Sequence, residues 1–522
     1  MDAIYKSVFL LSLLCFIHGE IHQNREKASE PHRIAIIGGG IGGAATAYFL
    51  QQLTDGSALI DVYESGRVGG RLATVPFAGE YYETGGSVIE ASNAYMQQFV
   101  DELGLSHSTD CPASAGLYNG SEWVFKTSDW QMLTLAKLLW RYGWDAYTLQ
   151  SITEDMLNKF SRIYSEQRKG NAYKDTEALL RAMDQSFPAL TKVTTREYLT
   201  NMGLHPRIVD ELVTAVTLCN YGQTPDIHAF VGAIALAGAG SNLWSVRGGN
   251  RQVPELLLTK ARAALLHRHV SVVAAVADPH TKQSFYQVTS VEASNDTPGL
   301  YTEGSNALYK HHQLEDEEIR TQDYDVVIIA TPLTADKSDI KFVNTTTKKR
   351  DFPGTFERIT ATFVEGRIRN EAFKLPASDS IDEILSVNPA LVYNSIGLLH
   401  GVDEDESAED GRCSKQSKAV YKLFSPQPLT KEQLKLIFSE INATKVVDWR
   451  AYPHYDIKSE EHQQKPAMFE LEPGLYHLNA VEWVGSAMEM SAIAAKNVAL
   501  LAIKHLTGDE SAGAMAQLRD EL

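Results

Sequence analysis

Cysteine is scarce in this sequence: only Cys15, Cys111, Cys219 and Cys413 occur among 522 residues. Cys15 lies in an N-terminal apolar run that we expect to be removed, and three cysteines cannot build a dense disulfide framework. The sequence therefore predicts one disulfide at most, and it is equally consistent with none. It also contains no G-x-S-x-G, H-E-x-x-H or C-x-x-C motif. For this reason neither a serine hydrolase nor a zinc site is expected.

Basic residues are also in short supply. The 48 Lys and Arg residues are outnumbered by 66 Asp and Glu residues, which gives a formal net charge of -18. Nucleic acid binding requires a basic footprint, so no nucleic acid partner is expected. Beyond the N-terminus, no window supplies the roughly 18 consecutive apolar residues of a transmembrane helix. The nearest candidate, residues 227–240, has a length that suits a buried helix better, so no transmembrane span is expected.

The two ends of the chain carry sorting signals. Lys6, the apolar run 8–17 and Gly19 form the three parts of a secretory signal peptide over residues 1–19, followed by a polar linker over 20–32. The alternative for the first segment is a membrane anchor. The last four residues, RDEL, differ from the ER-retrieval sequence KDEL by one conservative change, but they also suit the end of a loose tail over 506–522. N-x-S/T sequons that a luminal protein can glycosylate occur at Asn119, Asn295, Asn344 and Asn442.

A run of glycines near the start of the first domain, in RIAIIGGGIGGAATAYFL, points to a bound dinucleotide. The residues before it suit a buried parallel strand, and those after it suit a helix. In such a strand–turn–helix unit, Gly38 permits a tight turn, Gly40 lets a pyrophosphate approach the backbone, and Gly43 lets the helix pack against the strand. The next predicted strand ends at Glu64, whose carboxylate can accept hydrogen bonds from a ribose.

The residues that follow distinguish FAD from NAD. The sequence continues with SGRVGGRLAT and then EYYETGGSVIE. The doublet Gly69-Gly70 resembles the signature of two-domain FAD oxidases, a group that includes amine oxidases and phytoene desaturases. By that resemblance Arg71 lies near the flavin phosphates, and Gly86 and Ser87 lie near the isoalloxazine ring. FAD is therefore the expected cofactor.

Two later segments complete this resemblance. Residues 323–332 suit a buried strand that ends in Ala-Thr-Pro, where many FAD oxidases have Ala-Thr-Gly. Residues 475–502 suit a strand, a short loop and an amphipathic helix, whose N-terminus points toward the flavin pyrimidine ring in such oxidases. Glu482 in this loop matches the strand-end acid of the group only loosely. Together with Met488 it is a further candidate for cofactor binding.

Almost the whole chain after the signal peptide resembles the prenylcysteine oxidase family, including its oxidase-like branch. The residues that carry the resemblance include KLLWRYGWDAY, LCNYGQTPDIHAFVGAIALAGA, LWSVRGGNRQV, AYPHY and SAMEMSAIAAKNVALLA. The family implies an FAD-dependent thioether oxidase in lysosomes or secreted fluid. It would convert S-farnesyl- or S-geranylgeranyl-cysteine, with O2 and water, to a prenyl aldehyde, cysteine and H2O2. The resemblance also implies an association with lipoproteins.

This reaction needs no strong base, because a hydride rather than a proton leaves the carbon between sulfur and alkene. No catalytic residue is therefore assigned. A flavin amine oxidase and a non-catalytic lipoprotein-associated flavoprotein of the same fold are the alternatives.

A prenyl tail needs a long apolar cleft. Aromatic residues at helical spacing are usually core residues, and here some are expected to line that cleft. They are Trp130, Trp140, Tyr142, Trp144 and Tyr147. The run from Asn220 to Gln223 is expected either to approach the substrate face of the flavin or simply to end a helix.

The predicted fold is α/β. A Rossmann-like FAD-binding domain is assembled from residues 33–115, 244–335 and 450–505. A second, partly helical substrate domain comes from residues 116–243 and 336–449.

Overall fold

The computed structural model describes residues 31–108, 114–128, 130–240, 242–277, 284–293, 318–348, 352–377, 379–403, 419–455, 457 and 467–508. Several sequence-based expectations fall outside these residues. They are the signal peptide, most of the linker, the C-terminal RDEL, the sequon at Asn295, and Cys15, Cys111 and Cys413.

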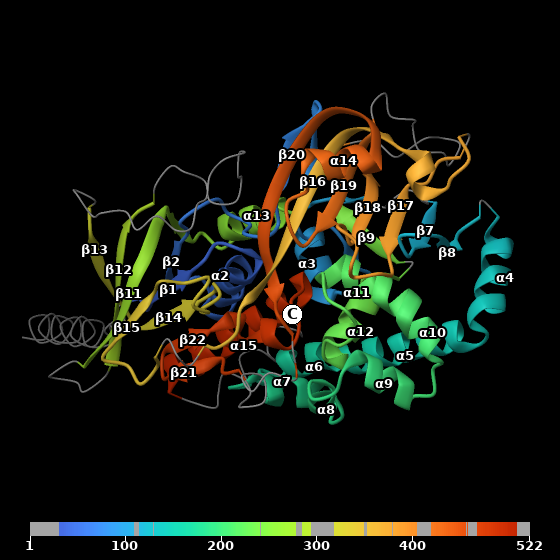
Figure 1. Ribbon diagram of the computed structural model, residues 1–522. Coiled ribbons are helices and arrows are strands. Elements are labelled where there is room, and N and C mark those ends of the chain that lie inside the picture. Colours follow the sequence, from blue (N-terminus) through green and yellow to red (C-terminus); the bar gives the residue numbers. More distant parts are fainter. Residues whose placement is uncertain are drawn as a thin grey trace, which may run out of the picture.

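A mostly parallel six-stranded sheet organises the first part of the molecule (Figure 1). Its central strands are short apolar runs that are buried on both faces, as expected for parallel strands covered on each side. Only the β21–β22 edge is antiparallel. In spatial order the strands are β10 (Ala264–Leu266), β2 (Leu59–Tyr63), β1 (Arg33–Ile37), β14 (Val326–Ile329), β22 (Leu475–His477) and β21 (Glu470–Glu472).

Helices cover one face of this sheet. They are α2 (Ile41–Leu53), α3 (Ala94–Glu102), α13 (Gln252–Lys260) and α15 (Met488–Thr507), and they form one large hydrophobic core with the sheet. The expectation of an amphipathic helix at the C-terminal end is wrong for α15, which packs against α2, α3 and α6 (Arg162–Arg168). Because neighbours surround it, most of its residues are buried.

A small four-stranded sheet covers the opposite face. It consists of β13 (Arg320–Tyr324), β12 (Ser284–Glu292), β11 (Arg268–Ala277) and β15 (Lys341–Val343). Its apolar side chains share a second core with Ala35, Ile37 and Ile329 of the six-stranded sheet. The nucleotide-type sheet is therefore enclosed on both faces, and its carboxyl edge is left for ligands.

The second part of the molecule contains a seven-stranded sheet, which is antiparallel except between β17 and β7. Its long strands β20 and β16 pair along most of their length. In spatial order the strands are β20 (Phe438–Pro453), β16 (Phe356–Ile368), β19 (Val420–Ser425), β18 (Ser395–Leu399), β17 (Glu383–Ser386), β7 (Ala115–Tyr118) and β8 (Trp123–Lys126).

Helices of this second part lie beside the sheet and extend to the right-hand end in Figure 1. The apolar run over 227–240 forms the short, largely buried helix α12, as predicted from its length. None of the helices among the described residues combines the length and apolar character needed to cross a bilayer. The helices are α4 (Gln131–Tyr142), α5 (Asp145–Phe160), α7 (Thr176–Met183), α8 (Phe187–Leu190), α9 (Thr195–Asn201), α10 (Pro206–Ile208), α11 (Thr214–Tyr221), α12 (Ala229–Ala237) and α14 (Lys431–Ile437).

The aromatic residues between 130 and 147 do not lie where the sequence suggested. Only Tyr142 is buried, in a core formed with α5 and the segment around Ile208. Trp130, Trp140, Trp144 and Tyr147 are exposed. The interpretation of these four residues as core or cleft lining is therefore wrong, because helical spacing shows which residues share a face and not which way that face points.

Candidate active site

The first glycine loop connects β1 to α2 at the carboxyl edge of the six-stranded sheet. The Gly38 amide donates to the carbonyl of Tyr63 at the end of β2 (2.8 Å). A Cβ on Gly43 would lie 1.9 Å from the carbonyl oxygen of Gly38, so the helix approaches the strand as closely as only glycine permits. Gly38 itself has a φ of +113°. Both residues are therefore needed to fold the loop.

Gly40 differs from these two glycines because it does not face the protein. It precedes α2 with a φ of -73°, a conformation open to any residue. A Cβ there would meet only the Gly69 carbonyl oxygen, at 3.9 Å. No side chain caps the first turn of α2, and that turn holds no acidic residue. The space that a side chain on Gly40 would fill therefore lies at the uncapped N-terminus of α2. An uncapped helix N-terminus suits a phosphate group.

Glu64 lies directly after β2 and beside this loop. Its carboxylate accepts hydrogen bonds from the amides of Gly39 (2.8 Å) and Gly66 (2.7 Å). Each carboxylate oxygen has a further lone pair. The two backbone amides hold the carboxylate in one orientation, and it retains the capacity to accept ribose hydroxyls.

The second glycine segment lies against the first. The Gly69 amide donates to the carbonyl of Gly39 (2.9 Å), and Gly40 and Gly69 form an isolated parallel bridge. A Cβ on Gly70, which has a φ of +57°, would lie 3.5 Å from the Cα of Gly40. Two stretches of bare backbone therefore meet at the N-terminus of α2, and together they form a cradle with few side chains.

Arg71 links this cradle to the C-terminal part of the chain. Its guanidinium donates to the carbonyl of Ala451 (2.6 Å) and forms an ion pair with Glu482. The Glu482 side chain is 1% exposed and that of Arg71 is 34% exposed. Burial alone would lower the pKa of Arg71, but the Glu482 carboxylate raises it above its usual range. The Arg71 guanidinium therefore stays charged, and it is the more accessible side chain of the pair.

The loop with Gly86 and Ser87 lies next to Arg71. The Gly86 amide donates to the carbonyl of Arg71 (3.1 Å), and a Cβ on Gly86 would lie 3.8 Å from the Cε of Met488. The segments that carry the eleven candidate cofactor-binding residues therefore lie beside one another along one edge. The residues are Gly38, Gly40, Gly43, Glu64, Gly69, Gly70, Arg71, Gly86, Ser87, Glu482 and Met488.

The sequence analysis overlooked Asn250, which holds the Gly86–Ser87 loop in place. Its fully buried amide nitrogen donates to the carbonyls of Gly86 and Ser87, both at 3.0 Å. Its oxygen accepts from the amide of Val246 (2.8 Å). The available signal was its position in the glycine-containing segment VRGGNRQV, which follows strand β9 (Leu243–Val246). Asn250 thus positions the loop that carries two candidate residues.

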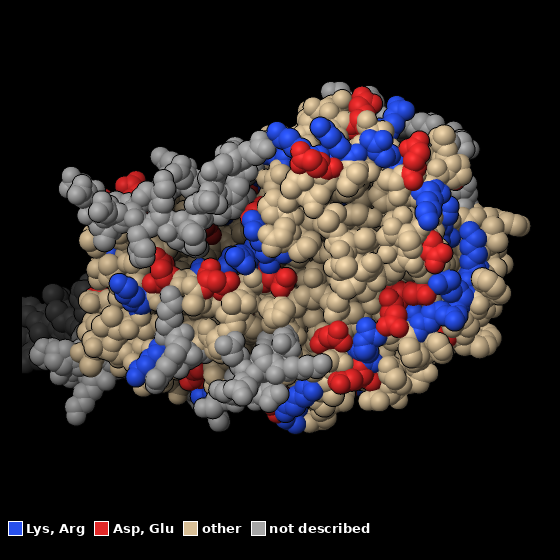
Figure 2. All heavy atoms as spheres, in the orientation of Figure 1, with Lys and Arg blue, Asp and Glu red and all other residues tan. Residues whose placement is uncertain are grey.

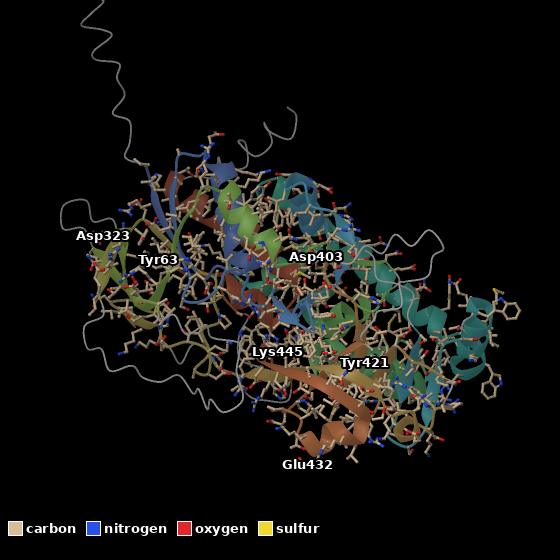
Figure 3. All side chains as sticks on the ribbon, turned by 90° about the horizontal axis from the view of Figure 1, so that it is seen from above. Tyr63, Asp323, Asp403, Tyr421, Glu432 and Lys445 are labelled. Atoms are coloured by element: carbon tan, nitrogen blue, oxygen red, sulfur yellow. The ribbon has the colours of Figure 1, made fainter. Side chains whose placement is uncertain are left out.

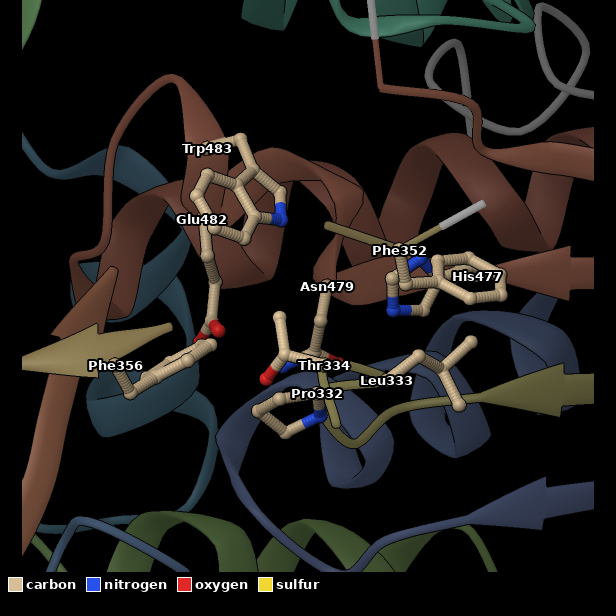
Figure 4. A pocket seen from close by; sticks show the side chains of 9 residues that line it. All are labelled: Pro332, Leu333, Thr334, Phe352, Phe356, His477, Asn479, Glu482 and Trp483. Atoms are coloured by element: carbon tan, nitrogen blue, oxygen red, sulfur yellow. The ribbon is translucent and has the colours of Figure 1, made fainter. Parts of the chain in front are cut away.

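A small pocket of about 10 Å³ opens beside Glu482, at the ends of β14 and β22 (Figure 4). It has room for about one water molecule. Four polar atoms of its lining side chains are buried and have no hydrogen-bond partner among the described residues. They are Thr334 Oγ1, His477 Nε2, Asn479 Oδ1 and Glu482 Oε2.

Buried polar atoms in native proteins nearly always have partners. Four such atoms at one pocket therefore require partners beyond the described residues, such as water or a polar part of the ligand. Together with the cradle at α2 and the Glu64 carboxylate, they fit a dinucleotide that extends along this edge.

The run from Asn220 to Gln223 ends helix α11, one of the two roles expected for it. Gly222 is the C-cap, with a φ of +66°. The Tyr221 hydroxyl donates to the carbonyl of Ser486 (3.0 Å), and Gln223 accepts from the amide of Tyr455 (2.9 Å). This turn therefore fixes the loop between Glu482 and α15. An approach to the flavin itself stays a prediction.

Two ionisable groups near the site were not singled out in the sequence. Burial and the charge of Arg71 lower the pKa of Lys337 to about 8, although Glu482 and Asp336 oppose the shift. Burial raises the pKa of Glu83 to about 7, although the Asn250 amide donates to this carboxylate (2.6 Å) and the nearby Lys422 and Arg251 oppose the shift. The second oxygen of Glu83 is buried and has no partner among the described residues.

Glu83 predicts a pH dependence of stability. A carboxyl whose pKa is raised in the folded state stabilises the fold fully below its unfolded pKa of 4.5, and this contribution is lost as the pH rises toward 7. We expect Glu83→Gln to be more stable than wild type at pH 7.5 by up to about 3 kcal/mol, and to show a smaller difference at pH 5. Urea unfolding of both proteins at the two pH values measures this. Equal differences at both pH values would contradict it.

Comparisons with known proteins agree with this geometry. The family model of prenylcysteine lyase matches residues 125–513, and that of the NAD(P)-binding Rossmann-like domain matches residues 36–103. The chain is 36% identical over 490 residues to prenylcysteine oxidase 1 of Homo sapiens, covering 93% of this chain and 92% of that protein. It is 35% identical over 478 residues to prenylcysteine oxidase 1-like of Bos taurus, covering 91% of each.

Among solved structures, cyclohexylamine oxidase from Brevibacterium oxydans matches with a TM-score of 0.57 at 15% identity, over 91% of this chain and 100% of that one. A fatty acid isomerase from P. acnes matches with a TM-score of 0.56 at 13% identity, over 90% and 99% of the two chains. At these identities the likeness establishes a shared fold and nothing more.

Proposed function

The chain belongs to the prenylcysteine oxidase family, whose matching model is that of prenylcysteine lyase, and from this premise we propose that it is an FAD-dependent oxidase of S-prenyl-L-cysteines. Its substrates are S-farnesyl- and S-geranylgeranyl-cysteine, and its products are the prenyl aldehyde, cysteine and H2O2. In cells this reaction would serve the degradation of prenylated proteins. O2 and water are the co-substrates.

The observation that carries the proposal is the joined pair of glycine segments at the uncapped N-terminus of α2. Gly40 and Gly70 leave space for the diphosphate of FAD, and Glu64 is held ready to accept the adenosine ribose hydroxyls. Arg71 supplies a positive charge at the same edge. Bound FAD supplies the acceptor for the hydride that leaves the carbon next to sulfur. The loop of Gly86 and Ser87, which Asn250 holds in place, lies beside Arg71 and would adjoin the flavin ring system.

The test is anaerobic mixing of the purified yellow protein with S-farnesyl-L-cysteine. We expect the flavin absorbance to bleach as the hydride is transferred, and admission of air to restore it with release of peroxide. A polyamine panel is the control, since the solved amine oxidases share the fold. Bleaching by a polyamine alone would assign the protein to the amine oxidases. Tight binding of farnesylcysteine with persistent colour would make it a non-catalytic carrier.

The cellular setting is part of the proposal. We place the protein in the lumen of the secretory pathway, with the lysosome favoured over secretion and over the ER. Asn344 and Asn442 are exposed and Asn119 is partly exposed, which supports glycosylation at these sequons. An association with lipoprotein particles stays a prediction.

A further inference from the structure

An exposed apolar surface covers helix α4 and the start of α5. It contains three of the seven tryptophans of the chain within fifteen residues. Trp130 is 70% exposed, Trp140 87%, Trp144 74% and Tyr147 68%. Four further exposed apolar side chains lie between them: Met132, Leu133, Leu135 and Leu139. Soluble proteins rarely expose contiguous apolar patches of this kind without a function. We call these eight residues the α4 surface.

Helix α4 presents its apolar side to the solvent, whereas an ordinary surface helix presents its polar side. Its polar side chains point toward the protein: Arg141 forms a bidentate ion pair with Glu211 (2.6 and 2.7 Å), Lys137 donates to the carbonyl of Lys126 (3.3 Å), and Thr134 bonds to Ser128. The residues on the outer face recur every three or four positions, as on one side of a helix. The helix is thus fixed to the body by polar contacts and presents its apolar side outward.

The shape of the α4 surface favours a fluid phase as its partner over a rigid protein surface. Trp140 lies two residues before the end of α4. Gly143 follows the helix with a φ of +60° and turns the chain into α5, so that Trp144 also stays exposed. Figure 3 shows side chains of the helix at the right-hand end standing away from the body. Projecting side chains of this kind can insert into a fluid phase, whereas an interface between two copies requires a self-complementary shape.

The composition and charge of α4 favour a phospholipid bilayer. Trp and Tyr are the side chains that concentrate at the boundary between lipid and water. Helix α4 has two basic residues and no acidic residue, in a chain with a net charge of -18. Figure 2 shows Lys and Arg side chains interspersed with Asp and Glu along the right-hand rim, where α4 and its neighbours lie. A solvent-facing apolar side that is rich in Trp and carries no acidic residue is compatible with a helix that lies in a membrane interface.

We propose that the α4 surface docks the protein onto a phospholipid bilayer, with the tryptophan side chains inserted at the level of the headgroups. The twelve residues of α4 lie along the bilayer and do not cross it. This proposal concerns a surface outside the cofactor site, and it does not depend on the reaction assigned to that site.

Flotation of the full-length protein, as purified after processing, with phosphatidylcholine vesicles tests the proposal, with and without added phosphatidylserine. We expect binding to both kinds of vesicle, because the tryptophan side chains rather than free charges make the contact. The double variant Trp140→Ala/Trp144→Ala should lower the partition coefficient at least about tenfold, because it removes two large apolar side chains from the contact with lipid. Leu436→Ala is the matched control: Leu436 on α14 is 70% exposed but lies outside the α4 surface. It should bind like wild type.

Three further measurements make the outcome decisive. The double variant should keep the flavin content, melting temperature and turnover of dissolved farnesylcysteine of the wild type, because both residues are exposed. Equal flotation of the double variant and wild type would overturn the proposal, as would no flotation of the wild type. If sedimentation equilibrium finds a wild-type dimer that the double variant converts to a monomer, the α4 surface joins two copies and the proposal is wrong.

Discussion

Gly40→Val is expected to abolish flavin binding while the protein still folds. The valine side chain has space in the folded chain, since a Cβ at this position meets no protein atom closer than 3.9 Å, and the local φ of -73° suits any residue. It would occupy the space between the two glycine segments where the FAD diphosphate is placed. We expect the Kd for FAD to rise at least about a hundredfold, equivalent to roughly 3 kcal/mol of binding free energy. Flavin absorbance after purification and titration with added FAD measure this.

Gly43→Ala is the informative comparison in the same motif. A Cβ there would lie 1.9 Å from the carbonyl oxygen of Gly38, so the helix and strand would have to separate. This variant should lose stability with or without flavin, whereas the flavin-free forms of Gly40→Val and wild type should melt at similar temperatures. A yellow Gly40→Val protein with one flavin per chain would show that the cofactor does not pass through the glycine cradle.

Arg71→Ala is expected to destabilise the flavin-free protein by about 3–5 kcal/mol. The substitution leaves the Glu482 carboxylate buried, at 1% exposure, without its counter-charge. Removing one partner of a buried ion pair costs this much because the remaining charge stays desolvated. Urea unfolding of the flavin-free proteins measures the loss, and FAD titration should show weaker binding in addition.

A second substitution distinguishes two causes of the lost stability, the loss of the ion pair and the loss of side-chain packing. Glu482→Gln in the Arg71→Ala background removes the stranded charge and keeps the volume of the side chain. The double variant should recover much of the stability, but it should still bind FAD weakly because the positive charge at the cradle is gone. If Arg71→Ala and the double variant unfold at the same urea concentration, the ion pair does not explain the loss.

The strands and helix around the candidate cofactor site could be predicted from the sequence, because they depend on residues that are close together in the chain. Glycines 38, 40 and 43 fix a strand, a turn and a helix within a few residues, and β1, α2 and β2 follow in the predicted order. The expected buried strand before Pro332 is also present as β14. In each case the composition of a short run determines both the element and its burial.

Contacts between distant segments could not be predicted in the same way. Asn250 acts through two carbonyl groups more than 160 residues away, and no pattern around it specifies these partners. The same holds for the four unpartnered atoms at the pocket, which come from two separate segments. For α4, the sequence showed an apolar stripe at helical spacing. Only the polar contacts of Lys137 and Arg141 with the body determine that the stripe faces outward.

The order of the strands in the six-stranded sheet has a consequence for protein synthesis. Strand β1 is among the first elements to leave the ribosome, but its hydrogen-bonded neighbour β14 follows nearly 300 residues later. Helix α15, which covers α2, comes at the end of the described chain. Arg71 likewise meets Glu482 across 411 residues. The nascent nucleotide fold therefore exposes its apolar faces throughout translation, and flavin loading has to wait until almost the entire polypeptide has been made.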